Sequence, residues 1–167
     1  KSNGIKHSMP FWDEQVAAMA ERFDDVSVEQ YHVDILAANF VTHPDWFDVV
    51  VGTNLFGDIL SDLGPATAGG IGVAPSANIN PDPAVPSMFE PVHGSAPDIA
   101  GEGVANPIAM IWSVVMMLED LGEQSAADDL MGAMENVTHE GRVLTRDLGG
   151  TASTNAFTDR LLAELKG

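Results

Sequence analysis

The chain has 167 residues, of which 45% are hydrophobic and none is cysteine, and its formal net charge is −18. This size and composition suffice for one packed core, or for two small lobes that share an interface. The absence of cysteine excludes disulfides, thiolate catalysis and zinc–thiolate sites and favours the cytoplasm, while the acid excess argues against nucleic-acid and anionic membrane partners because it repels phosphate.

The acidic residues are dispersed and form no long block, so we interpret them as a solubilising coat, which a high-salt habitat would favour. No apolar stretch reaches the length of a membrane-spanning helix, and no charged region before an apolar run predicts a signal peptide. Because Lys1 is not preceded by an initiator methionine, we expect a processed, trimmed or incompletely represented product.

In the first part of the chain, apolar residues at helical spacing alternate with short Val-rich runs that predict strands. The predicted helices span 9–23, 31–41 and 54–63, and the predicted strands span 26–30 and 46–51. We expect the helix at 31–41 to be buried, because Asp34 is its solitary acid. Gly64-Pro65 should end the helix that starts at residue 54.

The middle of the chain, residues 66–97, is rich in Gly, Ala, Pro and Asn and predicts exposed loops around brief strands at 71–73 and 88–89. Helices are then predicted at 106–121, 125–139 and 155–165. Alternating strands and helices indicate an α/β fold. The rise in glycine density near 65–72 suggests a boundary that separates residues 1–68 from 69–167.

Two carboxylates, Asp58 and Asp62, stand one helical turn apart and therefore project from the same helix face. Like charges at that spacing repel unless water or a cation separates them, and Mg²⁺ or Mn²⁺ prefers such oxygen ligands. The alternative is that both are solvated surface acids and that Asp34 forms an ordinary salt bridge.

A loop of small residues follows the strand predicted at 88–89 and reads His93-Gly94-Ser95-Ala96. Its backbone N–H groups could approach a dinucleotide closely. The alternative is a surface loop in which Asp98 caps a turn.

Several motifs in a fixed order resemble the metal-dependent β-hydroxyacid oxidative decarboxylases, the family of isocitrate, 3-isopropylmalate, tartrate and D-malate dehydrogenases. The sequences of these motifs are closest to those of the tartrate and D-malate enzymes, and the first half of the family's chain is absent. The matching motifs are Lys1-Ser2-Asn3, Tyr31-His32-Val33-Asp34, Gly57-Asp58-Ile59-Leu60-Ser61-Asp62, Glu90-Pro91-Val92-His93-Gly94-Ser95-Ala96-Pro97-Asp98 and Ala105-Asn106-Pro107.

The resemblance implies an isopropylmalate-dehydrogenase-like α/β fold with two lobes, here incomplete. Residues 1–68 would belong to the smaller, dimerising lobe with the metal-binding acids, and 69–167 to the larger, NAD-binding lobe. The implied metal ligands are Asp34, donated across a homodimer, with Asp58 and Asp62. Lys1 would relay a proton and act with Asp34 in catalysis, although a terminal lysine is ordinarily a solvated surface charge.

The resemblance also implies NAD as the cofactor, because the Asp98 carboxylate suits a free ribose 2′-hydroxyl and repels the 2′-phosphate of NADP. The implied cofactor-binding residues are Glu90, His93, Gly94, Ser95, Ala96, Asp98 and Asn106.

The implied reaction is metal-assisted, NAD-dependent oxidative decarboxylation of a small 2-hydroxy dicarboxylic acid: D-malate, tartrate or 3-isopropylmalate. None of the four arginines lies in a matched motif, so the isolated chain should be inactive or nearly so. The alternative is a non-catalytic dimerisation module that retains a vestigial metal and NAD site.

Overall fold

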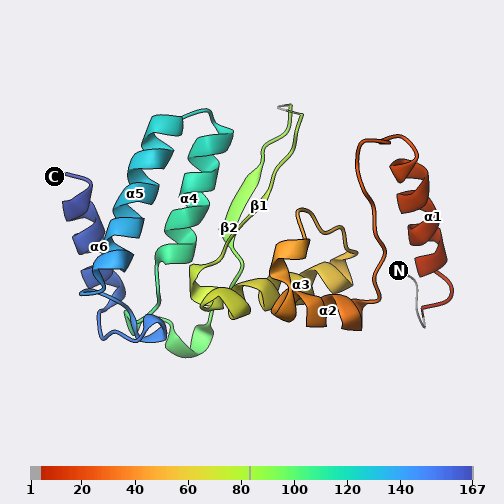
Figure 1. Ribbon diagram of the computed structural model, residues 1–167. Coiled ribbons are helices and arrows are strands. Elements are labelled where there is room, and N and C mark those ends of the chain that lie inside the picture. Colours follow the sequence, from red (N-terminus) through yellow and green to blue (C-terminus); the bar gives the residue numbers. More distant parts are fainter. Residues whose placement is uncertain (1–4, 83, 167) are drawn as a thin grey trace. The chain divides into compact units, whose positions relative to one another are not determined.

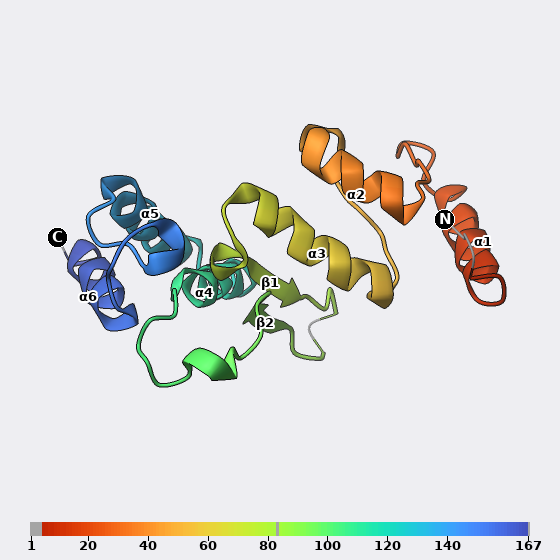
Figure 2. The ribbon, with the colours of Figure 1, turned by 90° about the horizontal axis from the view of Figure 1, so that it is seen from below.

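The computed structural model describes residues 5–82 and 84–166, which divide between Gly64 and Pro65 into two compact units. The order of their helices and strands can be followed in Figures 1 and 2. Among the described residues, no helix combines the length and the apolar character that crossing a membrane requires.

The first unit is helical. Its elements are α1 (Met9–Ala20), α2 (Val33–Thr42), the short 3₁₀ helix η1 (Pro44–Trp46) and most of α3 (Asn54–Ala68). Pro10 stands in the first turn of α1, where its missing N–H costs no hydrogen bond. The helices predicted at 9–23, 31–41 and 54–63 therefore exist.

Both strand predictions for this unit are wrong, because neither segment forms a strand. Residues 27–30 and 48–51 belong to no helix or strand, and Val49 and Val51 are 84% and 68% exposed. A strand needs a neighbour that pairs with its backbone groups. Within the described residues of the unit no such neighbour is present.

The burial of α2 and the position at which α3 ends also differ from the predictions. None of the residues of α2 is buried, so the expectation of a buried helix is wrong for this chain. Helix α3 continues through Pro65 to Ala68 instead of ending at Gly64-Pro65. It ends where Gly69 and Gly70 adopt φ angles of 144° and 135°, a region that glycine enters without steric cost, and both donate their N–H groups to the carbonyl of Pro65.

Three aromatic rings pack together beside α2. Phe47 lies 5.8 Å from Tyr31 and 5.1 Å from Phe40 between ring centroids, and the Tyr31 hydroxyl donates a hydrogen bond to the carboxylate of Glu29. This hydrogen bond, with desolvation and the negative charge of Glu29, raises the pKa of Tyr31 above its ordinary value. The stabilisation that the bond provides is therefore present below the ordinary pKa of tyrosine and is lost as the pH rises through the higher folded-state value.

Replacing Glu29 with alanine should lower the pKa of Tyr31 toward the ordinary value of about 10. Tyr31 is the single tyrosine of the chain, so the absorbance of tyrosinate during an alkaline titration reports on it alone. Glu21→Ala, which removes an exposed acid that ends α1, is the control and should leave the midpoint unchanged. Equal midpoints in Glu29→Ala and the unmodified chain would show that the hydrogen bond does not set this pKa.

The second unit is a helical layer on a β-hairpin. Strands β1 (Pro75–Asn78) and β2 (Met88–Pro91) pair antiparallel, and α4 (Ile108–Asp120) packs against both strands. Helix α5 (Gln124–Glu140) packs on α4, and α6 (Thr154–Glu164) packs on α5, as Figure 1 shows. The short 3₁₀ helices of this unit are η2 (Ile71–Val73), η3 (Pro97–Ile99) and η4 (Arg146–Leu148).

Most of the elements predicted in this unit are confirmed. The helices predicted at 106–121, 125–139 and 155–165 correspond to α4, α5 and α6, and the strand at 88–89 corresponds to β2. The strand predicted at 71–73 is wrong, because these residues form η2 and the strand begins at Pro75. Gly141, with φ of 70°, ends α5, and the hydroxyl of Ser153 accepts a hydrogen bond from the Ala156 N–H at the start of α6.

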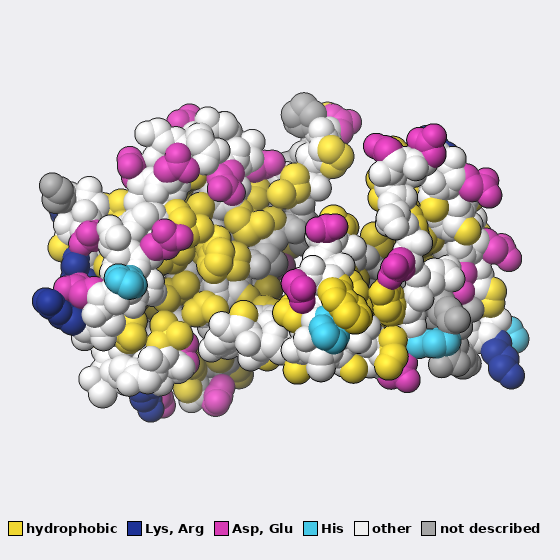
Figure 3. Space-filling model, viewed as in Figure 1, with side chains coloured by type: hydrophobic (Ala, Val, Ile, Leu, Met, Phe, Trp, Pro, Cys, Tyr) yellow, Lys and Arg dark blue, Asp and Glu magenta, His cyan; other side chains and the backbone are white. Residues whose placement is uncertain are grey.

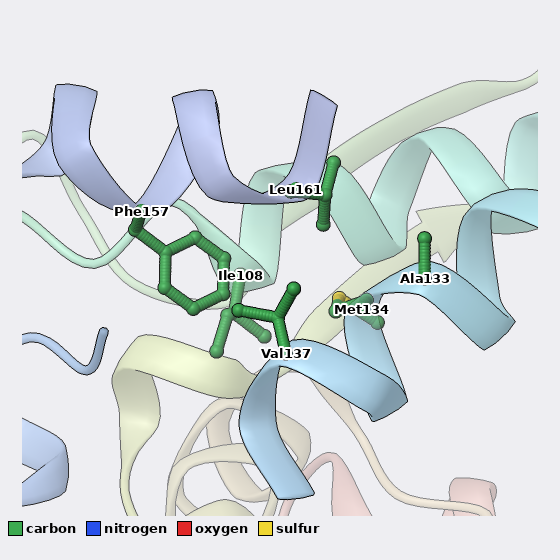
Figure 4. Packing of buried hydrophobic residues seen from close by; sticks show 6 residues of the cluster. All are labelled: Ile108, Ala133, Met134, Val137, Phe157 and Leu161. Carbon is green, nitrogen blue, oxygen red and sulfur yellow. The ribbon is translucent and has the colours of Figure 1, made fainter. Parts of the chain in front are cut away.

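The core of the second unit lies where α4, α5 and α6 meet (Figure 4). Phe157 of α6 and Val137 of α5 are fully buried within it. The residues of this core are Ile108, Ala133, Met134, Val137, Phe157 and Leu161. Hydrophobic side chains also gather on the surface over α4 and the hairpin (Figure 3). Met110 and Trp112 are exposed residues of α4.

Candidate active site

Helix α3 carries the two predicted metal-binding acids of the first unit. Asp58 and Asp62 lie one turn apart, both are exposed, and between them the Ser61 hydroxyl bonds back to the Asp58 carbonyl. Neither carboxylate forms an ion pair or a side-chain hydrogen bond with another described residue. Their oxygens therefore remain available as ligands for a hard cation.

The third predicted ligand, Asp34, lies in the first turn of α2. Its side chain is exposed and accepts a hydrogen bond of 2.9 Å from the Ile35 N–H. Within the described part of one chain, no three His, Cys, Asp or Glu side chains converge as a metal site. The residues present thus fit two of the three expected ligands, and a contribution of Asp34 from a second protomer stays a prediction.

The predicted cofactor-binding loop follows β2 in the second unit. The ring of His93 contacts the carbonyl of Gly94 through Nδ1 at 2.9 Å, and η3 begins directly after Ala96. Ala96 has a φ of 41°, a left-handed conformation that costs about 1 kcal/mol or more for a residue with a Cβ. Backbone strain of this kind is concentrated at functional loops.

The surface of this loop is open. A Cβ built on Gly94 would meet no atom within 4 Å, so packing inside the chain does not require glycine there. Ser95 and Asp98 are exposed, and Asp98 lies within η3. Room beside the loop and a free carboxylate fit the approach of a dinucleotide, whose ribose hydroxyls need an acceptor.

The other two predicted cofactor-binding residues, Glu90 and Asn106, form hydrogen bonds within the second unit. The carbonyl of Glu90 on β2 accepts a hydrogen bond of 2.8 Å from the Ser76 hydroxyl, which fixes its backbone and leaves its side chain exposed. Asn106 uses both ends of its amide: Oδ1 accepts from the Ile108 N–H at 2.9 Å, and Nδ2 donates to Asp147 at 2.8 Å. Asn106 therefore starts α4 and also ties it to η4.

Asp147 organises this corner of the unit, and the sequence interpretation missed it. Its Oδ1 accepts a hydrogen bond of 2.6 Å from the buried Thr145, and its Oδ2 binds Asn106. A Cβ on Gly72 would stand only 2.9 Å from Oδ2, so a larger residue there would displace the Asp147 carboxylate from its hydrogen bonds. No local pattern could reveal the contact between residues 41 positions apart.

The loop before α4 is also attached to α6. Thr154 donates its N–H to the carbonyl of Gly103 at 2.9 Å and its hydroxyl to the carbonyl of Ala105. These bonds hold the end of the segment that carries the predicted cofactor residues against a helix of the packed core.

Two arginines of the second unit, Arg142 and Arg160, pair with acids of the same unit. Arg160 pairs with Glu140 at 2.9 Å and with Glu164 at 2.8 Å, and Arg142 pairs with Glu140 at 3.2 Å. The hydrogen bonds to Glu164 and then to Glu140 raise the pKa of Arg160. Arg160, held by two carboxylates, is therefore not available to bind a dicarboxylic substrate. Lys1, the predicted proton relay, lies outside the described residues.

Curated relatives match almost the whole chain. The tartrate dehydrogenase/decarboxylase of Pseudomonas putida is 59% identical over 160 residues, which are 92% of this chain and 44% of that protein. The decarboxylating D-malate dehydrogenase of Escherichia coli (strain K12) is 54% identical over 166 residues, 96% of this chain and 46% of that protein. The chain thus spans less than half the length of these relatives.

Solved structures show the same fold. Isocitrate dehydrogenase from Methylococcus capsulatus superposes with a TM-score of 0.89 at 38% identity, covering 98% of this chain and 48% of that chain. TT0538 protein from Thermus thermophilus superposes with a TM-score of 0.92 at 40% identity, covering 100% of this chain and 34% of that chain. The predicted isopropylmalate-dehydrogenase-like fold, here incomplete, is confirmed. The sequence pattern of the isocitrate/isopropylmalate dehydrogenases matches residues 1–161, and the chain belongs to that family.

Proposed function

We propose that this chain is the carboxy-terminal part of an enzyme that oxidatively decarboxylates a 2-hydroxy dicarboxylic acid with NAD as oxidant. Tartrate and D-malate are the preferred candidates for the substrate, and 3-isopropylmalate is the third. The observation that carries the proposal is the identity of 54–59% to relatives named tartrate dehydrogenase/decarboxylase and D-malate dehydrogenase. The absence of cysteine supports a cytoplasmic location.

Asp58 and Asp62, joined by Asp34 of a second protomer, would hold the Mg²⁺ or Mn²⁺ ion. When bound, the ion supplies Lewis acidity at the oxygens of the substrate hydroxyl and carboxylate. The chain's own part is to place two negative charges on one face of α3, where they bind and orient that cation. The free state of both carboxylates supports this role.

The cofactor role rests on the loop after β2 in the second unit. The exposed carboxylate of Asp98 would accept a hydrogen bond from a ribose 2′-hydroxyl and would repel a 2′-phosphate, which favours NAD over NADP. Backbone N–H groups near Gly94 and the side chains of Glu90 and Asn106 would complete the contacts. We accordingly assign residues 69–167 to the NAD-binding lobe and 1–68 to the dimerising lobe.

A homodimer is part of the proposal. Helices α2 and α3 expose Ile35, Val41, Leu55 and Ile59, and apolar surface of this kind favours association. Asp34 lies on α2, so a partner that packs on this helix would bring the third carboxylate.

The proposal is tested by joining this chain to the amino-terminal part of the Pseudomonas putida relative and following NADH formation with tartrate, D-malate and 3-isopropylmalate. We expect turnover of tartrate or D-malate with NAD and much less with NADP, and none from the isolated chain. A folded chimera without turnover would favour the non-catalytic dimerisation module, and turnover by the isolated chain would contradict the proposed lack of substrate-binding arginines.

Metal binding is tested separately on the same chimera. Asp58→Asn and Asp62→Asn should each weaken Mn²⁺ binding at least about tenfold, measured by electron paramagnetic resonance of the free ion, because even outer groups of a metal site contribute that much. Asp45→Asn, which changes an exposed acid on η1, should leave the affinity unchanged. Equal affinities in the unmodified chimera and all three variants would exclude α3 as the metal site.

A further inference from the structure

The positively charged residues of this chain are confined to its two ends. Lysine and arginine occur up to Arg22 and again from Arg142 onward, and residues 23–141 contain neither, although most of the chain's 25 acids lie in that stretch. The formal net charge is −18. We propose that the fold is adapted to concentrated salt and reaches its full stability only when monovalent ions at about molar concentration screen these acids.

The first argument is the scarcity of ion pairs. Those between described residues form a single network, in which Arg142 and Arg160 pair with Glu140 and Glu164 at the C-terminal ends of α5 and α6. Of the acids in residues 23–141, Glu140 is therefore the one that has a basic partner within the described part of the chain. Charges without counter-charges repel one another, and a large net charge works against the compact state.

The second argument is the end of α4, where Glu119 and Asp120 are the last two residues. Both are exposed, and the last turn of this helix holds no basic residue. The C-terminal end of a helix carries a partial negative charge, which cations stabilise and carboxylates do not. The last turns of α1, α2, α3 and α6 also hold no basic residue.

These acids lie on the surface, where dissolved ions can reach them. In Figure 3, several acidic side chains lie over the upper ends of α4 and α5. Glu123, Asp128 and Asp129, which follow Glu119 and Asp120 in the chain, are exposed as well. The chain supplies no lysine or arginine in this region, so the solution must supply the counter-ions.

The third argument is the range of the repulsion. The screening length is about 10 Å in 0.1 M salt and about 3 Å in 1 M salt. Side chains one helical turn apart are separated by about 5–6 Å, so like charges at this spacing repel in 0.1 M salt and are largely screened in 1 M salt. No three His, Cys, Asp or Glu side chains among the described residues of one chain converge as a metal site. Screening by bulk ions therefore fits the dispersed acids better than one bound cation does.

Thermal unfolding of the whole chain, followed by circular dichroism in 0.1, 1 and 3 M KCl, tests the proposal. We expect Tm to rise by at least about 5 °C between 0.1 and 1 M KCl, because repulsion within the folded state is screened. The readout is stability, so the proposed function can fail without affecting this result.

Two double variants at the end of α4 separate screening from the general strengthening of apolar burial by salt. Glu119→Gln with Asp120→Asn removes two charges, and should raise Tm by about 3 °C in 0.1 M KCl and gain less than the unmodified chain from 1 M KCl. Glu119→Asp with Asp120→Glu is the matched control, because it keeps both charges at the same positions. The control should show the full rise of the unmodified chain.

Four outcomes would overturn the proposal. The first is the lack of a folded state at every KCl concentration, and the second is a Tm that does not rise with KCl. The third is an equal rise in the unmodified chain and in the variant without the two charges. The fourth is a rise in about 5 mM MgCl₂ that equals the rise in 1 M KCl and is lost in that variant, which would assign the effect to a bound divalent ion.

Discussion

Replacing Phe157 with alanine is expected to destabilise the second unit by about 3–5 kcal/mol, the usual cost of removing a buried aromatic side chain. The Phe157 ring has no exposed surface and packs in the core formed by α4, α5 and α6 (Figure 4). Its loss would leave a cavity beside Val137 and Ile108, which surrounding side chains fill only in part. Urea denaturation followed by circular dichroism measures the change in the free energy of unfolding.

The control for this variant lies on the same helix. Leu162 is 45% exposed, so Leu162→Ala should cost less than about 1 kcal/mol, because little apolar surface is lost from the core. Equal destabilisation by the two variants would mean that the exposed face of α6 contributes as much to stability as Phe157 does. That result would contradict the packing of α6 through Phe157 in the core.

Replacing Gly150 with alanine is expected to cost about 3 kcal/mol, at the upper end of the usual range for overpacking. A Cβ at this position would stand 1.9 Å from the carbonyl oxygen of Leu144, and backbone atoms cannot move aside as a flexible side chain can. The same turn carries hydrogen bonds from Gly150 to Thr145 at 2.9 Å and from Ala152 to Leu144 at 2.8 Å. The substitution must break or displace them.

The matched control is Gly132→Ala in the middle of α5. A Cβ there would meet nothing within 4 Å, and alanine favours a helix over glycine by about 1 kcal/mol, so this variant should be stabilised. Thermal unfolding of the two variants should therefore shift in opposite directions. A shift in the same direction for both would show that the contact with Leu144 is relieved by a movement of the turn.

The Gly150→Ala substitution should also disturb the candidate site. The turn that Gly150 closes carries Thr145 and Asp147, and Asp147 binds the Asn106 side chain at the start of α4. A displaced turn would therefore disturb the segment that carries the predicted cofactor residues, even though Gly150 is not one of them.

Local patterns predicted α4, α5 and α6 well because the signals that define these helices lie within or beside them. Gly141 ends α5 through its left-handed conformation, and Ser153 caps α6 through a hydrogen bond three residues along the chain. The apolar residues that recur at helical spacing form the core of the second unit. Each of these features needs only neighbours in the sequence or a second amphipathic helix.

The predicted strands failed for the opposite reason. Val49, Val50 and Val51 have the side chains of a buried strand, but a strand exists only where another segment pairs with it. The same holds for the isolated Asp147, whose role depends on a contact with Asn106 across 41 positions.

By itself, the sequence determined the family, the helices of the second unit, and the acids that stand one turn apart on α3, because motifs, caps and helical spacing are properties of neighbouring residues. Only the tertiary structure decided that residues 48–51 remain unpaired and that Asp147 of η4 binds Asn106, 41 positions away, at the start of α4. These features depend on contacts between distant segments, and the free energy of such contacts is not encoded in any local pattern.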